Sequence, residues 1–465
     1  MKWIYKTKLN EEGKVDKYKT RLVAKGYTQT KGVDYTEVFA PVARWDTIRI
    51  VLAVAAQEGW TMYQLDVKGA FLYGELKEEV YVDQPEGFIT KGEEDKVYKL
   101  NKALYGLKQA PRTWFSRIES YFQKEGFTKN SQDYALFIKK KSEKIIMVCL
   151  YVDDLLYAGN DEEMCAKFKK SMKEEFEMLD LGKMRYFLGV EISQNRDGIG
   201  LSQQKYVREV LERFNMKDCN SVKNPIVPGT VLSREGEVSV NPTLYKQLVG
   251  SLMYVTVTRP DIMYVVGLIL RYMTDPKEEH MQIAKRVLRY LKGTLNFGLW
   301  YRKVDKLKLV AYTDSDYARD VDDRKSVSGY VFMINDAAVN WSLKKQGIVT
   351  LSSTEAEYVV ATASACRCVW IKEVLRQIGV EDCDCVNIYC DNSSTIKLSK
   401  NPVMHRRTKH IDVRYHYLRD LSSQGKVRLV FCGTLEQVAD IMTKPIKLDQ
   451  FVKLRKLLGV QPIVD

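Results

Sequence analysis

The stretch IIMVCLYVDDLLYA, residues 145–158, sets two aspartates between two apolar, β-prone runs. This pattern predicts a β-hairpin whose tip presents the carboxylates of Asp153 and Asp154. The alternative is an ordinary turn that uses aspartate for local hydrogen bonding. A third acid, Asp66, stands near the end of another apolar strand. An ionised carboxylate is costly to bury there unless it is paired or bound to a metal.

Two strands that carry Asp66, Asp153 and Asp154 can bring three carboxylates together around two Mg²⁺ ions. Mg²⁺ prefers oxygen ligands, keeps several of its waters and accepts substrate phosphates. Two such ions, roughly 3.5–4 Å apart, clamp the attacking and leaving oxygens of an in-line displacement. The three acids therefore indicate metal-dependent nucleotide chemistry.

A second set of acids stands in the last third of the chain. Its members are Asp314 and Asp391 at the ends of expected strands, Asp440 at the start of a helix, and Glu355 or Glu357 on a long helix. The two glutamates are two positions apart, so they face different sides of that helix. A single strand-end acid is more often structural, whereas an ordered set of four is rarer and predicts a second carboxylate cluster.

The size and charge of the chain limit its class. At 465 residues it is long enough for about three domains, and 45% hydrophobic with 29% charged residues is a globular composition. A net charge of +13 favours a polyanionic partner, because Lys and Arg beside phosphates release condensed counterions. No apolar run approaches the ~20 residues that span a bilayer. The start shows no targeting peptide, so we expect an intracellular protein without membrane contact.

Nine cysteines in a chain without a secretory signal are expected to be reduced. Two Cys-x-Cys pairs, at 366–368 and 383–385, suggest a zinc site together with His405 and His410. Zinc ligand pairs usually have two to four residues between the cysteines, so buried or idle thiols are the better interpretation.

Strand and helix patterns alternate along the chain without repeats, and a polar segment with Pro and Gly, residues 218–242, indicates a linker. In one helical pattern Arg286, Arg289 and Lys292 recur at spacings of three, which suits either contact with a phosphate backbone or a solvated face. From residue 307 on, we expect a mixed α/β layer. The expected strands are 60–67, 145–152, 307–313, 327–334, 338–343, 386–389 and 427–432. The expected helices are 48–58, 112–125, 203–214, 244–254, 276–291, 353–378, one after Asp391, 409–421 and one from 435.

The motif Tyr151-Val152-Asp153-Asp154 resembles the metal-binding motif of reverse transcriptases. The surrounding sequence resembles the copia-type retroelement family. The resemblance runs through nearly all of the chain in family order. The matching stretches are KTRLVAKG at 19–26, FAPVAR at 39–44, LYGLKQAPR at 104–112 and FLGVEI at 187–192. It implies that Asp66, Asp153 and Asp154 ligate two Mg²⁺ ions, for which Mn²⁺ can substitute, with help from the backbone carbonyl of Val67.

The same resemblance implies a nucleotide pocket. Phe71 would be the bulky gate that excludes a 2′-hydroxyl, with a core aromatic as the alternative. Lys14 and Arg21 would hold the triphosphate of the incoming dNTP, Arg21 through its fork of donors, or else they are solvated charges. Tyr105 and Gly106 would line the pocket, although retroviral relatives carry Gln at the position of Tyr105. The resemblance also gives two less specific assignments: Lys183 as a proton donor to pyrophosphate or a plain surface lysine, and residues 187–192 as the primer-grip hairpin.

The C-terminal acids resemble the Asp-Glu-Asp-Asp site of the RNase H fold. This implies two Mg²⁺ ions held by Asp314, Asp391 and Asp440 together with Glu357, for which Glu355 is the runner-up. The histidine that RNase H enzymes often carry about ten residues before the last aspartate is replaced here by Val430. His405, His410 and His416 are expected to contact substrate or shape the fold.

These expectations describe an α+β / α/β multidomain protein, a right-hand polymerase of fingers, palm and thumb followed by an RNase H-like domain. The expected segments are 1–195 for fingers and palm, 196–305 for thumb and connection, 306–455 for the RNase H-like domain and 456–465 for a C-terminal tail. The expected activity is RNA- and DNA-directed DNA synthesis with removal of the RNA strand. Its partners would be RNA template, DNA primer, RNA–DNA hybrid and dNTPs, in the cytoplasm or a virus-like particle. A non-enzymatic hybrid-binding remnant and an RNA-dependent RNA polymerase are the alternatives.

Overall fold

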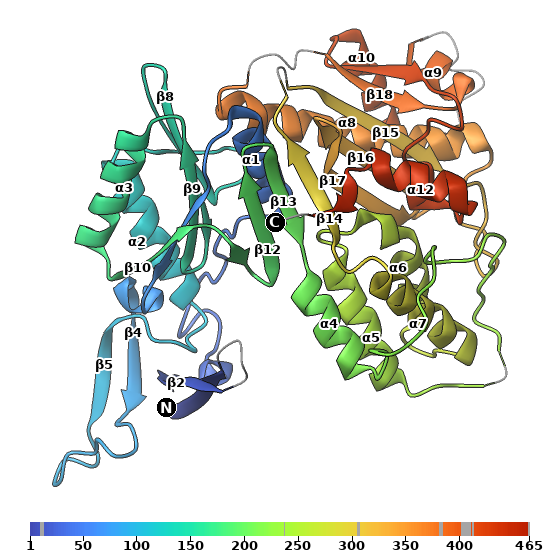
Figure 1. The fold of residues 1–465 in the computed structure, drawn as a ribbon. Helices are drawn as coiled ribbons and strands as arrows, with labels where there is room; N and C mark the ends of the chain where they lie inside the picture. The colour runs from blue at the N-terminus through green and yellow to red at the C-terminus, as the bar shows by residue number, and fades with distance from the viewer. Residues whose placement is uncertain are drawn as a thin grey trace. The chain divides into compact units, whose positions relative to one another are not determined.

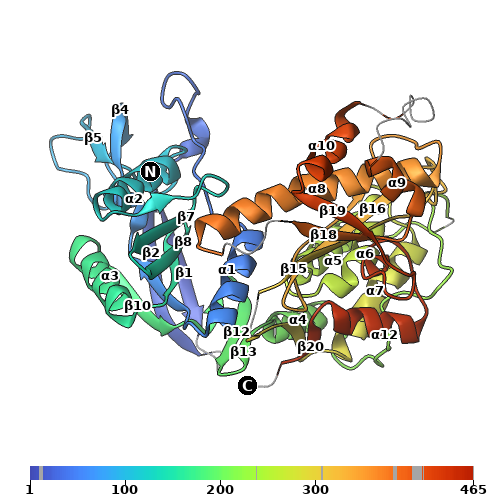
Figure 2. The same cartoon turned by 90° about the horizontal axis from the view of Figure 1, so that it is seen from above.

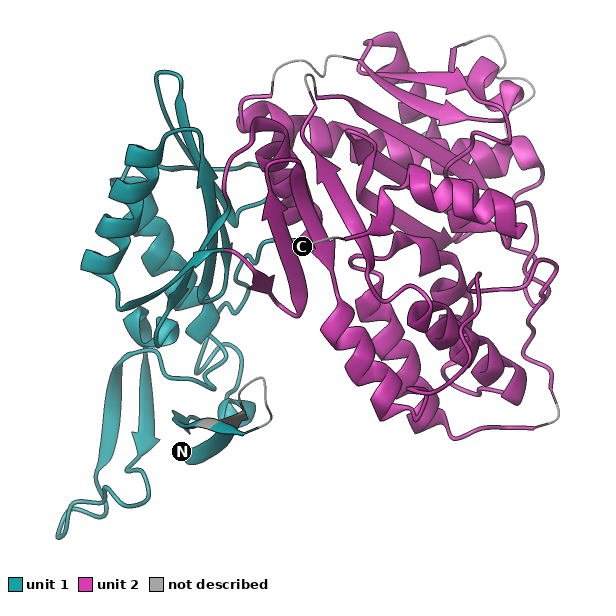
Figure 3. Ribbon diagram, in the orientation of Figure 1, with its two compact units in different colours: residues 1–44, 62–183 teal, residues 45–61, 184–465 magenta. Residues whose placement is uncertain are grey.

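The computed structural model describes residues 1–9, 14–236, 238–304, 307–380, 385–400, 411 and 413–463. The chain forms two compact units (Figure 3). Unit 1 comprises residues 1–44 and 62–183, and unit 2 comprises residues 45–61 and 184–465. Both units mix helices and strands, as the sequence predicts. Within the described ranges, no helix combines the length and apolar character needed to cross a bilayer.

Unit 1 is built on a six-stranded antiparallel sheet in the order β10-β3-β9-β8-β7-β6. Figure 1 labels β8, β9 and β10 of this sheet. The strands are β3 (Tyr63–Val67), β6 (Thr128–Lys129), β7 (Leu136–Lys141), β8 (Lys144–Tyr151), β9 (Asp154–Gly159) and β10 (Met178–Lys183). Helices α2 (Ala110–Lys124) and α3 (Glu162–Glu175) bury an aromatic core against it, including Trp114, Phe122 and Phe168. This core fixes the strands that carry the first set of acids.

Two further hairpins complete unit 1. They are β1 (Lys2–Leu9) with β2 (Val15–Val23), and β4 (Glu75–Asp83) with β5 (Val97–Lys102). The end of β2 is tied to the segment before α2, because Ala24 N donates to Tyr105 O at 2.7 Å. Gly26 and Gly106 allow this close approach, since a Cβ on Gly26 would lie 1.9 Å from Gly106 O. Gly106 also has a φ of +93°, which favours glycine.

Unit 2 contains a five-stranded sheet in the order β17-β16-β15-β18-β19. Its strands are β15 (Leu309–Ser315), β16 (Val327–Ile334), β17 (Ala337–Lys345), β18 (Val386–Cys390) and β19 (Val427–Phe431). β15, β18 and β19 are parallel, while β16 and β17 are antiparallel to their neighbours. This arrangement confirms the mixed layer expected from residue 307 on.

Helices cover both faces of this sheet (Figures 1 and 2). Gln346 donates to both Ser328 on β16 and Ala356 on α8 (Ser353–Gln377), so one face lies against α8. The neighbouring Gly329 faces the other side, where a Cβ would lie 2.7 Å from side chains of α11 (Asp440–Thr443). Smaller helices at the sheet ends are α9 (Ser393–Lys400) and α10 (Tyr417–Ser423).

The rest of unit 2 joins distant parts of the chain in a second five-stranded sheet, β11-β12-β13-β14-β20. Its strands are β11 (Tyr186–Phe187), β12 (Val190–Asn195), β13 (Gly198–Ser202), β14 (Phe297–Arg302) and β20 (Val460–Pro462). The same part of unit 2 also contains the helices α1 (Trp45–Glu58), α4 (Gln204–Arg213), α5 (Pro242–Val255), α6 (Met263–Ile269), α7 (Glu278–Lys292) and α12 (Leu448–Leu457). This sheet thus contains strands from three of the segments expected from the sequence, 1–195, 196–305 and 456–465. The boundaries expected between these segments stay a prediction.

Two expectations about helices are wrong. In place of one helix over 409–421, a 3-10 turn covers Val413–His416 and the α-helix starts at Tyr417, while residues 409, 410 and 412 lie outside the described ranges. The closing helix from Leu435 is two helices, α11 and α12, which are separated by Pro445. Proline cannot donate the backbone hydrogen bond that would continue α11.

The three cations of α7 are partly exposed, and each also makes a hydrogen bond within unit 2. Arg286 donates to Asn224 Oδ1 at 2.5 Å, Arg289 to Asn220 O at 2.7 Å and Lys292 to Cys219 O at 2.6 Å. The three cations therefore fasten the start of the expected linker to the helix. Spacing alone could not show this, because the acceptors lie more than sixty residues away in sequence.

Candidate active sites

The first set of acids meets at the end of the unit 1 sheet. Asp66 on β3 pairs in register with Asp154 at the start of β9, and Val67 N donates to Asp153 O at 2.8 Å. One carboxylate oxygen of each of Asp66, Asp153 and Asp154 lies within 4.8 Å of the others. All three side chains are half-buried. The structure thus brings together the three acids singled out from the sequence.

The hairpin tip that carries these acids is strained and held from behind. Its two-residue turn is Val152–Asp153, and Val152 has a φ of +57°, which a β-branched residue rarely adopts. Trp114 on α2 donates from Nε1 to Val152 O at 2.7 Å and holds this conformation. Such strain costs on the order of 1–3 kcal/mol and tends to occur at functional sites. Trp114 was not identified from the sequence, because its partner lies 38 residues away.

The electrostatics of this cluster suit a cation. Burial raises the pKa of Asp154 to about 6, with further contributions from Asp153 and Asp66. Gln64, two residues before Asp66 on the same strand, donates to Asp154 Oδ1 at 2.9 Å and opposes this rise. Three oxygen donors with mutually unfavourable charge are the ligand set that Mg²⁺ prefers. A metal ion would remove the repulsion, so the residues fit the metal expected here.

Several residues of the expected nucleotide pocket lie together near this cluster. The Phe71 and Tyr105 rings are 4.9 Å apart, and the guanidinium of Arg21 lies 5.4 Å from the Tyr105 ring centroid. Burial and the nearby Asp153 raise the pKa of Tyr105, while Arg21 lowers it. Lys14 is exposed just ahead of β2, seven residues before Arg21.

Two other predicted positions of the polymerase region have clear places. Lys183 is exposed on β10 opposite Tyr63, which is three residues from Asp66 along β3. The stretch 187–192 contains a tight hairpin, in which Phe187 pairs with Val190. Phe187 itself is buried against Trp45 of unit 2, with ring centroids 5.7 Å apart. It therefore supports the hairpin from inside.

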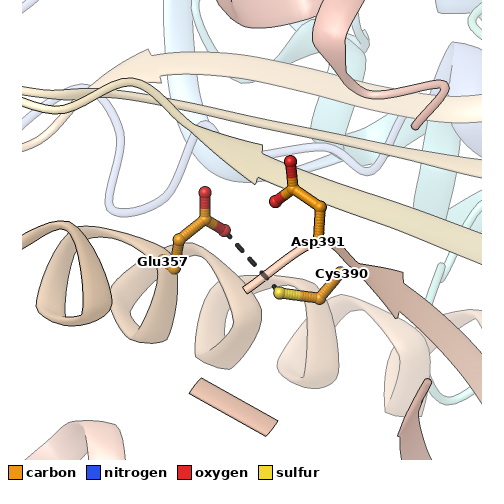
Figure 4. Close-up of side chains that lie close together, drawn as sticks. All are labelled: Glu357, Cys390 and Asp391. Carbon is orange, nitrogen blue, oxygen red and sulfur yellow. Dashed lines mark hydrogen bonds between the residues drawn. The ribbon is translucent and has the colours of Figure 1, made fainter. Parts of the chain in front are cut away.

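The second set of acids meets in unit 2, where strand ends and helices converge. Asp314 on β15, Asp391 after β18 and Asp440 on α11 have carboxylate oxygens within 4.8 Å of one another. Glu357 on α8 joins through Asp391, in a group that also contains the Cys390 thiol (Figure 4). Glu357 Oε1 accepts from Ser315 N at 3.0 Å, which orients the carboxylate toward the ends of the strands.

The two candidate glutamates have different surroundings. The side chain of Glu355 accepts from Leu351 N at 2.6 Å, and its own N–H donates to Ser352 Oγ at 3.1 Å. Ser352 is thus the N-cap of α8, and the Glu355 side chain reaches back to the N–H of the residue before this cap. Glu355 therefore stabilises the end of α8, whereas Glu357 is the glutamate that lies with Asp391.

Burial makes it unfavourable for the carboxyl groups of this second cluster to be ionised. It raises the pKa of Asp440 to about 7 and that of Glu357 well above its usual range, and Asp314 adds to both shifts. Burial and Asp314 also raise the pKa of Asp391. Four oxygen ligands with little solvent fit a divalent cation. The acids converge as the sequence predicts.

Lys444 and Thr443 are parts of this cluster that sequence reasoning missed. Lys444 Nζ lies 2.8 Å from Asp440 Oδ1 and 3.6 Å from Asp314 Oδ2. Although burial lowers the pKa of Lys444, Asp314 and Asp440 raise it overall. Thr443 donates to Asp314 Oδ2. The spacing of four residues between Asp440 and Lys444 is the only sequence signal that could have found this pair.

Cysteines and histidines give no further cluster among the described residues. The eight described cysteines are free, and neither Cys366, Cys368 nor Cys385 belongs to a group of potential metal ligands. Cys383, His405 and His410 lie outside the described ranges. His416 Nδ1 lies 3.5 Å from the hydroxyl of Tyr358 on α8, a contact within the fold of unit 2.

Comparison with known proteins places the chain. The sequence model of the family described as "Reverse transcriptase (RNA-dependent DNA polymerase)" matches residues 1–228. A "Retrovirus-related Pol polyprotein from transposon TNT 1-94" of Nicotiana tabacum is 42% identical over 470 residues, covering 99% of this chain and 35% of the relative. A "Putative transposon Ty5-1 protein" of Saccharomyces cerevisiae is 35% identical over 302 residues, covering 64% of this chain and 98% of the relative. The chain belongs to the reverse transcriptase family of copia-type retrotransposons.

This reverse transcriptase family member spans about a third of the length of the plant polyproteins that it matches. Among solved structures, an N-terminal RNase H domain from Mycobacterium tuberculosis, solved as a fusion with maltose-binding protein, is 14% identical. The matched region covers 32% of this chain and 98% of the solved RNase H chain, with a TM-score of 0.22. A likeness of that strength does not establish a shared fold.

Proposed function

We propose that this chain is an RNA- and DNA-directed DNA polymerase with RNase H activity. It copies retrotransposon RNA into DNA and degrades the RNA strand of the resulting hybrid, in both cases by two-metal-ion phosphoryl transfer. The observation that carries the proposal is that each compact unit gathers its own set of three aspartates, with carboxylate oxygens within 4.8 Å of one another. Membership of the reverse transcriptase family supports the polymerase half directly.

In the polymerase half, Asp66, Asp153 and Asp154 would hold two Mg²⁺ ions, with the carbonyl of Val67 as a further ligand. Bound there, the ions would stabilise the attacking 3′-oxygen and the leaving pyrophosphate. Trp114 fixes the hairpin tip, so the carboxylates need little reorganisation on binding. Mn²⁺ offers similar oxygen coordination and would substitute for Mg²⁺.

The incoming dNTP would bind beside these acids. Arg21 presents a fork of donors suited to phosphate oxygens, and the contact between Phe71 and Tyr105 supports a sugar-sensing wall. Phe71 would exclude a 2′-hydroxyl by its bulk, while Tyr105 and Gly106 would line the pocket. Lys14, just ahead of β2, would reach the triphosphate.

In the nuclease half, Asp314, Glu357, Asp391 and Asp440 would hold two Mg²⁺ ions, which would activate a water to cut RNA. Lys444 lies beside Asp440 and Asp314 and would offset their charge before metal enters. Glu357 is kept in place by the backbone N–H of Ser315.

The proposed partners are RNA template, DNA primer and RNA–DNA hybrid, in agreement with the net charge of +13. The polymerase would have the fingers, palm and thumb of a right hand, with fingers and palm in 1–195 and thumb and connection in 196–305. The nuclease domain would cover 306–455 and the tail 456–465. The hairpin at 187–192 would grip the primer. We also propose a cytoplasmic location or one within a virus-like particle.

The test is a pair of assays on the full chain. With Mg²⁺, an RNA template, a DNA primer and dNTPs, we expect primer extension, and with a labelled RNA–DNA hybrid we expect RNA cutting. A chelator should stop both. Binding of hybrid without either activity, in Mg²⁺ or Mn²⁺, would establish the alternative of a non-enzymatic remnant. Extension with rNTPs in preference to dNTPs would instead identify an RNA-dependent RNA polymerase.

A further inference from the structure

A hollow of about 730 Å³ lies on the second sheet of unit 2, and neither proposed reaction uses it. Its lining comes from the turn between β12 and β13, from the end of β14 and from β20; Figure 1 labels β12, β13 and β14. Pockets that hold small molecules have volumes of roughly 300–1,000 Å³. None of the lining residues belongs to either carboxylate cluster. A ligand would therefore bind there independently of the proposed function.

Trp300 on β14 contributes an aromatic surface to this hollow. It pairs in register with Gly200 on β13, and a Cβ on Gly200 would lie 2.7 Å from Cε3 of the indole. Because Gly200 has no side chain, the indole can lie close against β13. Trp300 is nevertheless partly exposed, so part of its ring system is open to a ligand. A flat ring is the partner that such a surface favours.

The charged side chains around this indole are mostly positive. Arg196, Arg302 and Lys303 line the hollow and are exposed, whereas Asp197 is the one acid among the described lining residues. Arg302 Nη2 donates to Gln461 Oε1 at 3.0 Å, and no ion pair of the three cations is found in the described ranges. Cations that share a concave surface without acidic partners attract an anion. The hollow therefore favours a negatively charged ligand.

Two amide side chains complete the polar lining. Asn195 Oδ1 accepts from Asp197 N at 2.9 Å, and Gln461 Oε1 accepts from Arg302. Both amide oxygens are thus engaged within the fold, while the amide nitrogens can donate to acceptors of a ligand. Carbonyl oxygens and ring nitrogens of a nucleobase are acceptors of this kind. An indole, three cations and two amide donors together fit a flat heterocycle that carries phosphate.

We propose that Trp300, Arg302 and Arg196 form a binding site for a nucleotide unit. The base stacks on the indole, and the phosphate is held by the two guanidinium groups, whose planar donors match phosphate oxygens. An aromatic surface beside basic side chains binds nucleotides in this way without regard to sequence. Lys303 adds positive charge nearby, since its Nζ would lie 3.1 Å from a Cβ on Gly59 at the end of α1. A free nucleoside triphosphate and one nucleotide of a single strand present the same chemistry.

Binding is tested on the full chain in the presence of a chelator, which keeps divalent ions away from both carboxylate clusters. The probes are ATP, as a free nucleotide, and a strand of four thymidylates. Trp300→Ala should weaken binding of at least one probe by about tenfold, as loss of one stacked base predicts. Weaker binding of ATP alone identifies a free nucleotide as the ligand, and weaker binding of the tetranucleotide alone identifies a strand.

Trp370→Ala is the matched control for Trp300→Ala. Trp370 on α8 is also a partly exposed tryptophan of unit 2, and the guanidinium of Arg367 lies 4.7 Å from its ring centroid. It does not line the hollow, so binding of both probes should stay unchanged. Unchanged binding of both probes in folded Trp300→Ala, or equal weakening by Trp370→Ala, overturns the proposal.

If Trp300→Ala does not fold, two milder variants decide. Arg302→Gln changes an exposed side chain and should weaken binding about tenfold, and for a strand it should lower the salt dependence of the affinity by about one phosphate contact. Arg428→Gln, also exposed but on β19, should change neither quantity. Trp300→Phe should still bind but lose the quenching of tryptophan emission that a stacked base causes. Unchanged affinity in Arg302→Gln, or unchanged quenching in Trp300→Phe, contradicts the site.

Discussion

The two carboxylate clusters of this chain solve the same electrostatic problem in different ways. In unit 1 the acids are half-buried at a strained hairpin tip, and an uncharged partner, Gln64, restrains one of them. In unit 2 Asp314, Glu357 and Asp440 are each at least 95% buried, and a lysine supplies positive charge. Solvent screens the first cluster, so its geometry depends on backbone strain and packing. The second depends on charge compensation, and its stability should respond more strongly to metal, pH and the loss of its lysine.

Removing Lys444 is expected to give the largest difference between the two clusters in their effect on protein stability. In Lys444→Met the buried acids lose their cation, which should destabilise the metal-free protein by about 1–3 kcal/mol at pH 8. Mg²⁺ should restore more stability to this variant than to wild type, because the ion then supplies the missing charge. The measurement is thermal unfolding with and without Mg²⁺.

Lys68→Met is the matched control for Lys444→Met. Lys68 forms an exposed ion pair with Glu177 at 2.7 Å beside the unit 1 cluster. Exposed pairs of this kind contribute little, so no measurable change is expected. Equal destabilisation by both substitutions would remove the proposed contrast between the clusters.

A smaller effect concerns the pH dependence of stability without metal. The folded-state pKa of Asp440 is raised to about 7, above its unfolded value near 4. Its contribution to stability is therefore present below pH 4 and is lost as pH rises toward 7. In Asp440→Asn the fall in unfolding temperature between pH 5 and 8, measured with chelator, should be shallower than in wild type.

Asp154→Asn gives the comparison within unit 1. Because burial raises the pKa of Asp154 only to about 6, the corresponding loss of stability ends at a lower pH and is smaller. An identical pH profile for Asp440→Asn and wild type would show that Asp440 is ionised in the folded, metal-free protein. That result would contradict the account of the unit 2 cluster.

The smallest effect is expected from Gln64→Leu. Loss of the hydrogen bond to Asp154 should raise the pKa of this carboxyl further, by about half a unit. The acidic limb of the primer-extension profile should then shift to higher pH, because more Asp154 is protonated and cannot hold metal. Gln84→Leu, whose amide donates only to backbone carbonyls of an exposed loop, should leave the profile unchanged. A shift in both variants would show that the effect is not specific to Asp154.

The sequence was sufficient for the acids and for most of the elements that carry them. Strand-end aspartates are visible because a charge interrupts an apolar run, and the pattern over 327–334 predicted β16 to the residue. The partners of these acids were not predictable in the same way. Trp114 and Val152, or Lys444 and Asp314, meet only through the tertiary fold.

Local sequence patterns also could not predict that α1 packs within unit 2. A helix was predicted from residue 48 on, but its packing partner was not. Arg49 is buried and donates to Val339 O at 2.8 Å and Val257 O at 3.1 Å, more than two hundred residues away. The bond to Val339 ties this helix, whose segment lies in sequence between two parts of unit 1, to β17 of unit 2, and no periodicity encodes such a contact.

The central claim is that two independent metal clusters perform two separable reactions. It is tested most directly by measuring primer extension and hybrid cutting side by side for Asp153→Asn and Asp314→Asn. We expect Asp153→Asn to lose extension by about a thousandfold or more and to keep cutting, and Asp314→Asn to do the reverse. Loss of both activities in either folded variant would contradict the claim.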